Sequence, residues 1–131
     1  MAKYHDEIKG RTPTGGKFIP HYKVKKKCHL GGDEILTELS EVEKRIIKRV
    51  KGGNKKIKLK LAAYANVFDG KNYKKVKILD VVENKAHPLY ERRKIITKGA
   101  LIKTEIGLAK VTSRPSQDGI VNAILIQKSN I

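Results

Sequence analysis

The sequence has no tryptophan, two phenylalanines, one cysteine and no long apolar run. The single cysteine, Cys28, excludes an internal disulfide framework, as expected in a reducing compartment. No stretch approaches the roughly 18 consecutive apolar residues of a transmembrane helix, and the first residues lack the apolar segment of a signal peptide. With few large aromatics and no lipidation motif, attachment to a membrane surface is also disfavoured. These absences predict a cytoplasmic protein that does not bind membranes.

Acidic residues are scarce relative to basic ones. Thirty lysines and arginines stand against 13 aspartates and glutamates, giving a formal charge of +17 over 131 residues. A compact domain with that much charge of one sign repels itself unless a polyanion neutralises it. Nucleic acid is the commonest such partner, because each phosphate contact releases condensed counterions. The composition therefore predicts a nucleic-acid-binding protein.

No catalytic or metal-binding constellation is recognisable. The run Gly10 to Phe18, GRTPTGGKF, begins like a phosphate-binding P-loop, but Gly16 stands where that motif requires lysine and no apolar strand precedes it. Four residues of zinc-ligand type match no finger or ribbon spacing: His5, His21, Cys28 and His29. His87 has no nucleophile identifiable beside it. We expect no enzyme activity, no cofactor and no metal.

The first 32 residues differ from the rest. They hold eight basic side chains, two glycine pairs and two prolines, with almost no periodic apolar pattern. Such a segment cannot bury enough apolar surface to fold alone. We therefore interpret residues 1–32 as a basic, extended N-terminal tail that orders on an RNA partner, and residues 33–131 as one core domain.

A strand begins near Lys55. Ile57, Leu59 and Leu61 alternate with three lysines, which in a strand places the apolar side chains on one face and the lysines on the other. We expect all three apolar side chains to point into the interior of the β-barrel that the strands described below predict. Gly53-Asn54 suits a type II′ turn, which predicts a hairpin in which Val50 faces Ile57 and Arg49 faces Lys58.

The segment before this hairpin is ambiguous. Its apolar residues also fit a 3.6-residue repeat, so an amphipathic helix from Asp33 into the forties competes with a strand. Residues 33–43 carry five acids and no base, whereas residues 44–60 carry nine bases and no acid. The charge switch marks the entrance to the folded core but does not choose between helix and strand.

Further short runs of β type occur downstream. They are Val76–Val82, Leu101–Thr104, Leu108–Ser113 and Ile120–Ile126, separated by turn residues. The apolar residues change face within the first of these runs, which predicts a bulge near Ile78. Several short strands without clear helices between them predict an all-β fold, a small antiparallel β-barrel or sandwich.

The basic residues recur in clusters along the whole chain, and aromatic residues near them can stack on unpaired bases. No helix-turn-helix, zinc-finger or RNP-type pattern predicts sequence-specific recognition. The candidate RNA-binding residues are Arg11, Thr14, Gly15, Gly16, Lys17, Lys23, Lys25, Lys26, Lys27, Arg45, Arg49, Lys51, Lys55, Lys56, Lys58, Lys60, Tyr90, Arg92, Arg93, Lys94 and Arg114.

Several of these segments carry a resemblance. The run from Val81 to Ile126, above all Arg92–Glu105 and Thr112–Asn122, resembles the core of the eighth small-subunit ribosomal protein of the archaeal and eukaryotic type. Upstream, VKGGN (residues 50–54), AYANV (63–67) and TGGK (14–17) match the same family. The short length resembles the archaeal form. One departure is that Arg11 is the only arginine before Arg45, and lysine neutralises phosphate without forming the bidentate fork of arginine.

The resemblance implies a small β-barrel with a basic N-terminal extension, bound to small-subunit rRNA beside neighbouring small-subunit proteins. It also implies that Lys44 to Lys51 is a strand leading into the hairpin. We therefore expect a structural constituent of the small ribosomal subunit, a monomer within the ribonucleoprotein, that binds rRNA by phosphate neutralisation and shape recognition. The alternative is a nucleic-acid-binding regulator that acts outside the ribosome.

Overall fold

A computed structural model describes residues 11–16 and 27–128. The chain divides into two units, Met1–Glu34 and Ile35–Ile131, and each is described by itself. The expected ordering of the tail on RNA falls mainly on residues outside the described ranges, so it stays a prediction.

The first unit contains a tight turn at residues 11–16. The Thr12 amide donates to the Gly16 carbonyl over 2.8 Å, and the Gly15 amide donates to the Thr12 carbonyl over 2.9 Å. Gly15 has φ +86°, a conformation that glycine adopts at low cost. A single 3-10 turn, η1 (Lys27–His29), follows later in this unit.

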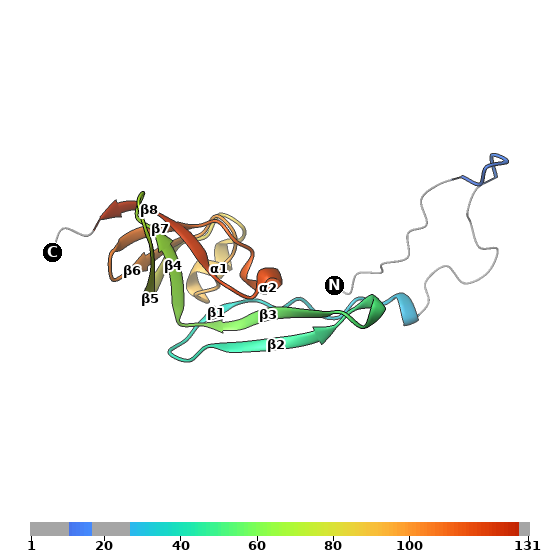
Figure 1. The fold of residues 1–131 in the computed structure, drawn as a ribbon, viewed down its shortest axis with the longest axis horizontal. Coiled ribbons are helices and arrows are strands. Elements are labelled where there is room, and N and C mark those ends of the chain that lie inside the picture. The colour runs from blue at the N-terminus through green and yellow to red at the C-terminus, as the bar shows by residue number, and fades with distance from the viewer. Residues whose placement is uncertain (1–10, 17–26, 129–131) are drawn as a thin grey trace. The chain divides into compact units, whose positions relative to one another are not determined.

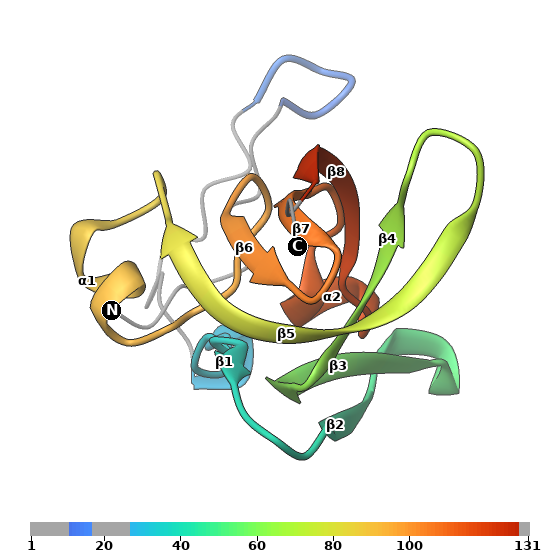
Figure 2. The same cartoon turned by 90° about the vertical axis from the view of Figure 1, so that its left-hand side faces the viewer.

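The second unit contains a closed five-stranded barrel in the order β4-β5-β6-β7-β8 (Figures 1 and 2). Its strands are β4 (Tyr64–Phe68), β5 (Tyr73–Glu83), β6 (Leu101–Thr104), β7 (Gly107–Val111) and β8 (Asn122–Lys128). Consecutive strands pair antiparallel. The barrel closes through a parallel pair, β4 with β8, in which Asn66 lies opposite Asn122. The predicted small β-barrel is confirmed.

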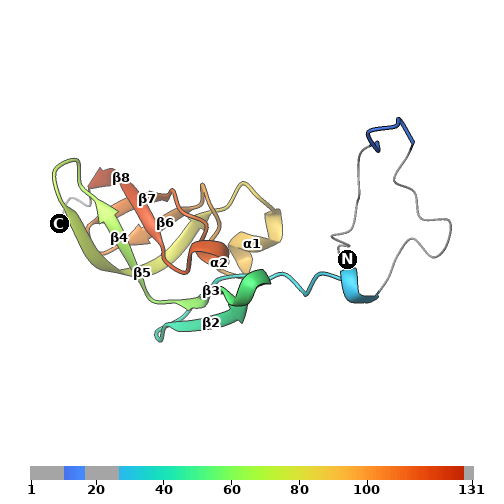
Figure 3. The same ribbon diagram turned by 45° about the vertical axis from the view of Figure 1, so that its right-hand side comes forward.

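A second sheet has the order β1-β3-β2. Its strands are β1 (Glu38–Leu39), β2 (Lys44–Arg49) and β3 (Lys55–Ala62), and a 3-10 turn, η2 (Lys51–Gly53), connects the last two. In Figure 3 the hairpin of β2 and β3 runs past α2 (Pro115–Asp118), with η2 at its far end. Residues 44–49 are thus a strand, and the helical periodicity of this segment is overruled by pairing with β3.

The expected hairpin register was wrong. Ile47 lies opposite Ile57, and Arg49 lies opposite Lys55. The Val50 amide donates to the Asn54 carbonyl over 2.7 Å, so the connection is longer than a two-residue turn. Both Gly52 and Gly53 adopt positive φ, which permits this longer turn and shifts the register.

The expectation that Ile57, Leu59 and Leu61 all point into the barrel was also wrong. Strand β3 belongs to the second sheet, and only Leu59 of the three is fully buried, with 1% of its surface exposed. Ile57 is 48% exposed because it lies toward the hairpin turn, where only α2 covers it. Alternation along a strand identifies its two faces but not how far the cover over one face extends.

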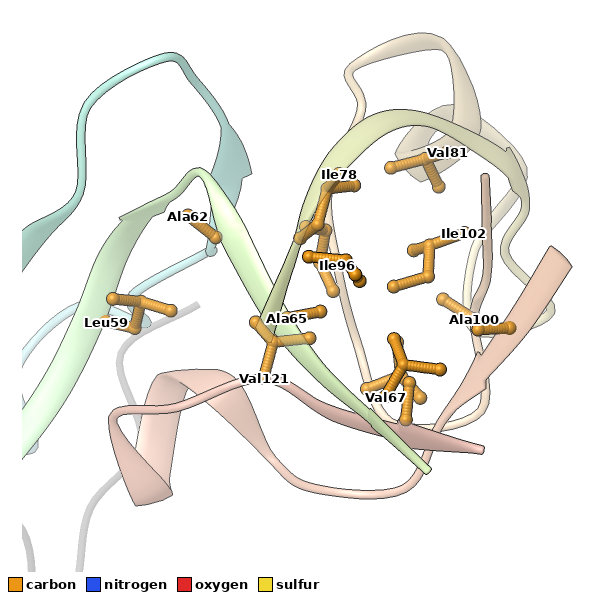
Figure 4. Packing of buried hydrophobic residues seen from close by; sticks show 14 residues of the cluster. Leu59, Ala62, Ala65, Val67, Ile78, Val81, Ile96, Ala100, Ile102 and Val121 are labelled. Carbon is orange, nitrogen blue, oxygen red and sulfur yellow. The ribbon is translucent and has the colours of Figure 1, made fainter. Parts of the chain in front are cut away.

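Small side chains fill the core. Figure 4 shows Ala65, Val67, Ile78, Ile96 and Ile102 within the space that the barrel strands enclose, with Leu59 and Ala62 on the β3 side. A barrel of few strands is narrow, so alanines alternate with branched residues inside it. The buried core cluster contains Leu59, Ala62, Ala65, Val67, Val76, Ile78, Val81, Ile96, Ala100, Ile102, Ala109, Val111, Val121 and Ala123.

Two short helices flank these sheets, α1 (Pro88–Arg92) and α2. The predicted bulge is confirmed, because the pairing of β5 with β6 shifts register between Ile78 and Asp80. Consequently Ile78 and Val81 are both buried, whereas Leu79 is exposed. Among the described residues, no helix has the length and apolar character needed to cross a membrane.

Candidate nucleic-acid interface

The hairpin of β2, η2 and β3, hereafter the basic hairpin, gathers most of the predicted cations of the core. Side chains directly opposite in an antiparallel pair lie on the same face. Lys48 is opposite Lys56, and the alternation of β3 adds Lys58 and Lys60 to that face. Lys58 is half-buried and the other three are exposed. The face is therefore a row of four ammonium groups.

Like charges oppose each other twice in this hairpin. Lys48 faces Lys56, and in the next pair Arg49 faces Lys55. Like charges directly opposite in a sheet destabilise it, by up to about 1 kcal/mol a pair. Within the described part of the chain, none of these four side chains forms an ion pair. The arrangement is unfavourable for the free protein and favourable for binding a polyanion.

The root of the hairpin is fixed by contacts with α2. The Arg45 side chain donates through Nε to the Gly119 carbonyl over 3.3 Å and pairs with Glu43 over 3.0 Å. Gly119 has φ +76°, and a Cβ there would lie 3.1 Å from the Ile57 carbonyl oxygen. The chain therefore approaches β3 closely only because residue 119 is glycine. Arg45, predicted as an RNA contact, also anchors the hairpin.

Helix α1 and the two residues that follow it hold the second predicted cluster, Tyr90 with Arg92, Arg93 and Lys94, hereafter the α1 corner. Arg93 pairs with Glu38 of β1 over 3.3 Å, and Lys94 pairs with Asp80 of β5 over 3.0 Å. Arg92 is exposed and makes no such pair within the described residues. Two of the three cations are thus already neutralised by carboxylates of the same domain.

The α1 corner is also held by buried polar contacts. Asn84 is buried, donates to the Ile95 carbonyl over 2.8 Å, and accepts from the Thr97 hydroxyl over 2.8 Å. The His87 side chain caps α1 by accepting from the Leu89 amide over 3.1 Å. Lys94 adopts φ +54°, the one positive φ among described residues other than glycine. These contacts fix the loop and present Arg92 at its surface.

The carboxylate of Asp80 reports on this arrangement. The hydrogen bond from Lys94, followed by one from the Val81 amide, lowers the pKa of Asp80 below its ordinary value. The side chain is about half exposed, so solvent screens the pair and its contribution to stability is small.

The predicted tail residues are only partly described. Arg11, Thr14, Gly15 and Gly16 lie in the exposed turn, where the Arg11 guanidinium donates to the Gly15 carbonyl over 3.2 Å. Lys27 is exposed in η1. Outside the described ranges lie Lys17, Lys23, Lys25 and Lys26.

Two other predicted residues lie at element ends. Arg114 precedes α2 and is exposed, and its amide donates to the Asp118 carboxylate over 2.8 Å. Lys51 begins η2, at the turn of the basic hairpin. Lys51 therefore lies in the turn of the basic hairpin, beyond the pair of Arg49 and Lys55.

Sequence reasoning missed the aromatic residues of β4 and β5. Tyr64 and Phe68 of β4 lie opposite Lys77 and Tyr73 of β5, on the outer wall of the barrel. The signal was available, because Tyr64, Asn66 and Phe68 alternate with Ala65 and Val67 on one side of a four-residue turn. Alanine and asparagine are weak strand formers, and they concealed the period.

Comparison with known proteins adds to this geometry. The family model for ribosomal protein S8e matches residues 5–126. The chain belongs to the ribosomal protein S8e family. The small ribosomal subunit protein eS8 of Hyperthermus butylicus is 52% identical over 131 residues, covering 98% of this chain and 95% of that protein. The eS8 protein of Ignicoccus hospitalis is 53% identical over 130 residues, with 98% and 99% covered.

A third relative, the eS8 protein of Staphylothermus marinus, is 50% identical over 121 residues, covering 90% of this chain and 93% of that protein. Membership in the S8e family confirms the expected family, and the archaeal type is confirmed because these relatives come from archaea. The expected role of a structural, non-enzymatic constituent of the small ribosomal subunit is confirmed with it. The general partners of an S8e protein are rRNA and ribosomal proteins, in the ribosome of the cytoplasm. Which side chains contact the RNA is a separate question.

Proposed function

We propose that this S8e protein binds small-subunit rRNA chiefly through the basic hairpin, as a monomer within the ribonucleoprotein. The observation that supports this most is that cations oppose each other in two adjacent pairs, Lys48 with Lys56 and Arg49 with Lys55. Phosphates placed between such side chains replace repulsion with charge-assisted hydrogen bonds. Because these contacts are to phosphates, they position the protein and select RNA by shape instead of by base sequence.

In this proposal the root of the basic hairpin attaches it to the core, and its far end contacts the RNA. Leu59 and the contacts of Arg45 fasten the root to the core. Beyond α2, both faces of the hairpin carry cations, Arg49 and Lys55 on one and Lys48 and Lys56 on the other. A two-stranded ribbon of this kind can meet phosphates on both sides of an RNA groove. The tail, residues 1–32, supplies further cations, and we propose that it lies along the same rRNA.

The slope of binding affinity against salt tests the proposal. Replacing Lys56, Lys58 and Lys60 by alanine removes up to three phosphate contacts and should reduce the log-log slope by about two units, at roughly 0.7 to 0.9 per contact. The probe is purified small-subunit rRNA, measured by filter binding from low to moderate salt. Thermal melts should show that the parent protein and the triple alanine variant are both folded.

A matched control keeps the net charge equal. Lys85, Lys98 and Lys103 are exposed lysines outside the basic hairpin. Replacing these three by alanine should change the slope by less than one unit. Equal slopes for the two triple variants would show that net charge alone drives binding, and the proposed interface would be wrong.

A further inference from the structure

The outer wall of β4 and β5 carries aromatic rings and lysines in alternation. Tyr64, Asn66 and Phe68 of β4 lie opposite Lys77, Lys75 and Tyr73 of β5, while Ala65, Val67 and Val76 between them are buried inside the barrel. Three of the seven tyrosines and phenylalanines in the chain are therefore on one hairpin. We call the set Tyr64, Phe68, Tyr73, Lys75 and Lys77 the aromatic wall.

The rings and the ammonium groups of the aromatic wall lie within contact distance. The rings of Phe68 and Tyr73 have centroids 4.8 Å apart, tilted by 38°. Lys75 Nζ lies 4.7 Å from the centroid of the Tyr64 ring. Tyr73 is nevertheless 74% exposed. The pair of rings is thus a platform with one side open to solvent.

The surface continues onto β8. The parallel pairing places Asn122 beside Asn66 and Ile124 beside Phe68, and the Asn66 side chain donates through Nδ2 to Oδ1 of Asn122 over 3.2 Å. Ile124 is 49% exposed, with Lys110 of β7 opposite it. No aspartate or glutamate lies among these outward positions of the described strands. Along these strands the charged side chains beside the rings are therefore the lysines Lys75, Lys77 and Lys110, while Asp69 follows Phe68 in the turn that joins β4 and β5.

Charge and ring geometry together select the partner. A protein surface that covered the rings would still have to supply carboxylates for Lys75, Lys77 and Lys110. Single-stranded RNA meets both requirements at once, because its bases stack on aromatic rings while its phosphates pair with lysines. Base stacking is tolerant of sequence, since every base has a π face. A double helix keeps its bases stacked on one another and offers only phosphates.

We propose that the aromatic wall binds unpaired nucleotides, with Tyr73 and Phe68 stacking on a base and Lys75 and Lys77 contacting the phosphates beside it. The inference rests on the proposed function, because the nucleotides belong to the rRNA that the basic hairpin engages. The two surfaces are separate: the turn between β4 and β5 and the turn of the basic hairpin lie at opposite sides of the barrel unit in Figures 1 and 3. One surface recognises phosphates and the other recognises bases.

The experiment compares two RNA oligomers of equal length and charge, oligouridylate and an abasic oligomer. The full chain is titrated with each, by anisotropy of a label on the RNA. Tyr73→Ala should weaken oligouridylate binding by about 5-fold or more, the lower end of the range for stacking one base, and leave the abasic oligomer unaffected. Tyr73→Phe, which keeps the ring, should retain the affinity. Lys77→Ala should weaken both oligomers equally.

Repeating the titrations in the Lys56, Lys58 and Lys60 alanine background separates the two proposals. The effect of Tyr73→Ala should persist there, because the aromatic wall does not depend on the basic hairpin. If the triple alanine variant reduces the salt slope as expected but Tyr73→Ala causes no loss of affinity specific to oligouridylate, the proposed role of the aromatic wall is wrong and that of the basic hairpin stands. Equal losses on both oligomers would overturn the role of the aromatic wall too. The proposal would also be overturned if Tyr73→Ala left the affinity for both oligomers unchanged and weakened the binding of other small-subunit proteins, because the aromatic wall would then be a protein interface.

Discussion

The basic hairpin and the α1 corner both carry clusters of basic residues and differ in what surrounds these cations. In the basic hairpin, Lys48 and Lys56 face each other without a carboxylate between them. In the α1 corner, Arg93 and Lys94 are paired with Glu38 and Asp80. We therefore expect RNA contacts chiefly where the fold leaves the cations unpaired. Where the fold supplies carboxylates, the same residue types hold two strands and a loop together.

The largest expected effect separates the two faces of β3. Leu59→Ala should lower the free energy of unfolding by about 2 to 5 kcal/mol, because it removes buried methyl groups and leaves a cavity in a core of small residues. Reversing Lys56, Lys58 and Lys60 to glutamate should change stability by no more than about 1 kcal/mol while greatly weakening binding to small-subunit rRNA. Urea unfolding and filter binding measure the two quantities.

The matched change for Leu59→Ala is Ile57→Ala. Ile57 occupies the same face of β3 but is 48% exposed, so its truncation should cost clearly less than that of Leu59. If the triple glutamate variant unfolds while Leu59→Ala remains stable, the assigned faces of β3 are reversed.

A smaller effect tests the α1 corner against the basic hairpin. Arg92→Ala should reduce the salt slope of rRNA binding by about 0.7 to 0.9, the value for one phosphate contact. Arg93→Ala and Lys94→Ala should reduce it less, because their charges are already partly compensated by Glu38 and Asp80. The three single variants are compared by filter binding against a salt series. Equal slope changes for all three would mean that the ion pairs open on RNA.

The cost of like charges in the basic hairpin can be measured without RNA. Lys48→Glu places a carboxylate opposite Lys56 and should raise the stability of the free protein by roughly 0.2 to 1 kcal/mol. The same change should weaken rRNA binding. Lys77→Glu makes an equal change of charge at a position whose directly opposite residue is Tyr64 and not a lysine, and serves as the stability control. Thermal melts at low salt compare the two. A gain no larger than that of the control would show that the opposed lysines do not repel measurably.

Sequence reasoning found the elements whose signals are local. The run Leu101–Thr104 is β6 as expected, and the change of parity near Ile78 is a bulge. The register of the basic hairpin was missed because Gly52 and Gly53 both accept positive φ, and nothing local selects the longer turn. Strand β4 was missed because its buried residues are an alanine and a single valine.

The candidate sites divide along the same line. The lysines of β3 were predicted as RNA contacts because alternation within that strand assigns their face, whereas Lys48 of β2, which lies opposite Lys56, was not among the predicted residues. The pairing of Arg93 with Glu38 joins residues 55 positions apart, and the sequence holds no signal for it. The aromatic wall depends on which residue of β4 lies opposite which residue of β5. Which cations form ion pairs and which residues share a surface depend on contacts between distant parts of the chain. They were therefore harder to predict than the strands.

The smallest expected effect is the pH dependence of the Asp80 and Lys94 pair that holds the α1 corner. Because the pKa of Asp80 is lowered in the folded protein, first by the Lys94 hydrogen bond and then by the Val81 amide, the ionised carboxylate stabilises the fold. That stability is fully present above the ordinary aspartate pKa and is lost as the pH falls through the lowered one. Asp80→Asn should therefore melt a few degrees below the parent at pH 7 and alongside it near pH 2. Lys94→Ala should add little to Asp80→Asn at either pH, since the two residues act through one contact. If the difference in melting temperature between Asp80→Asn and the parent widens as the pH falls, the protonated carboxyl is the stabilising form and the ion pair with Lys94 does not hold the corner.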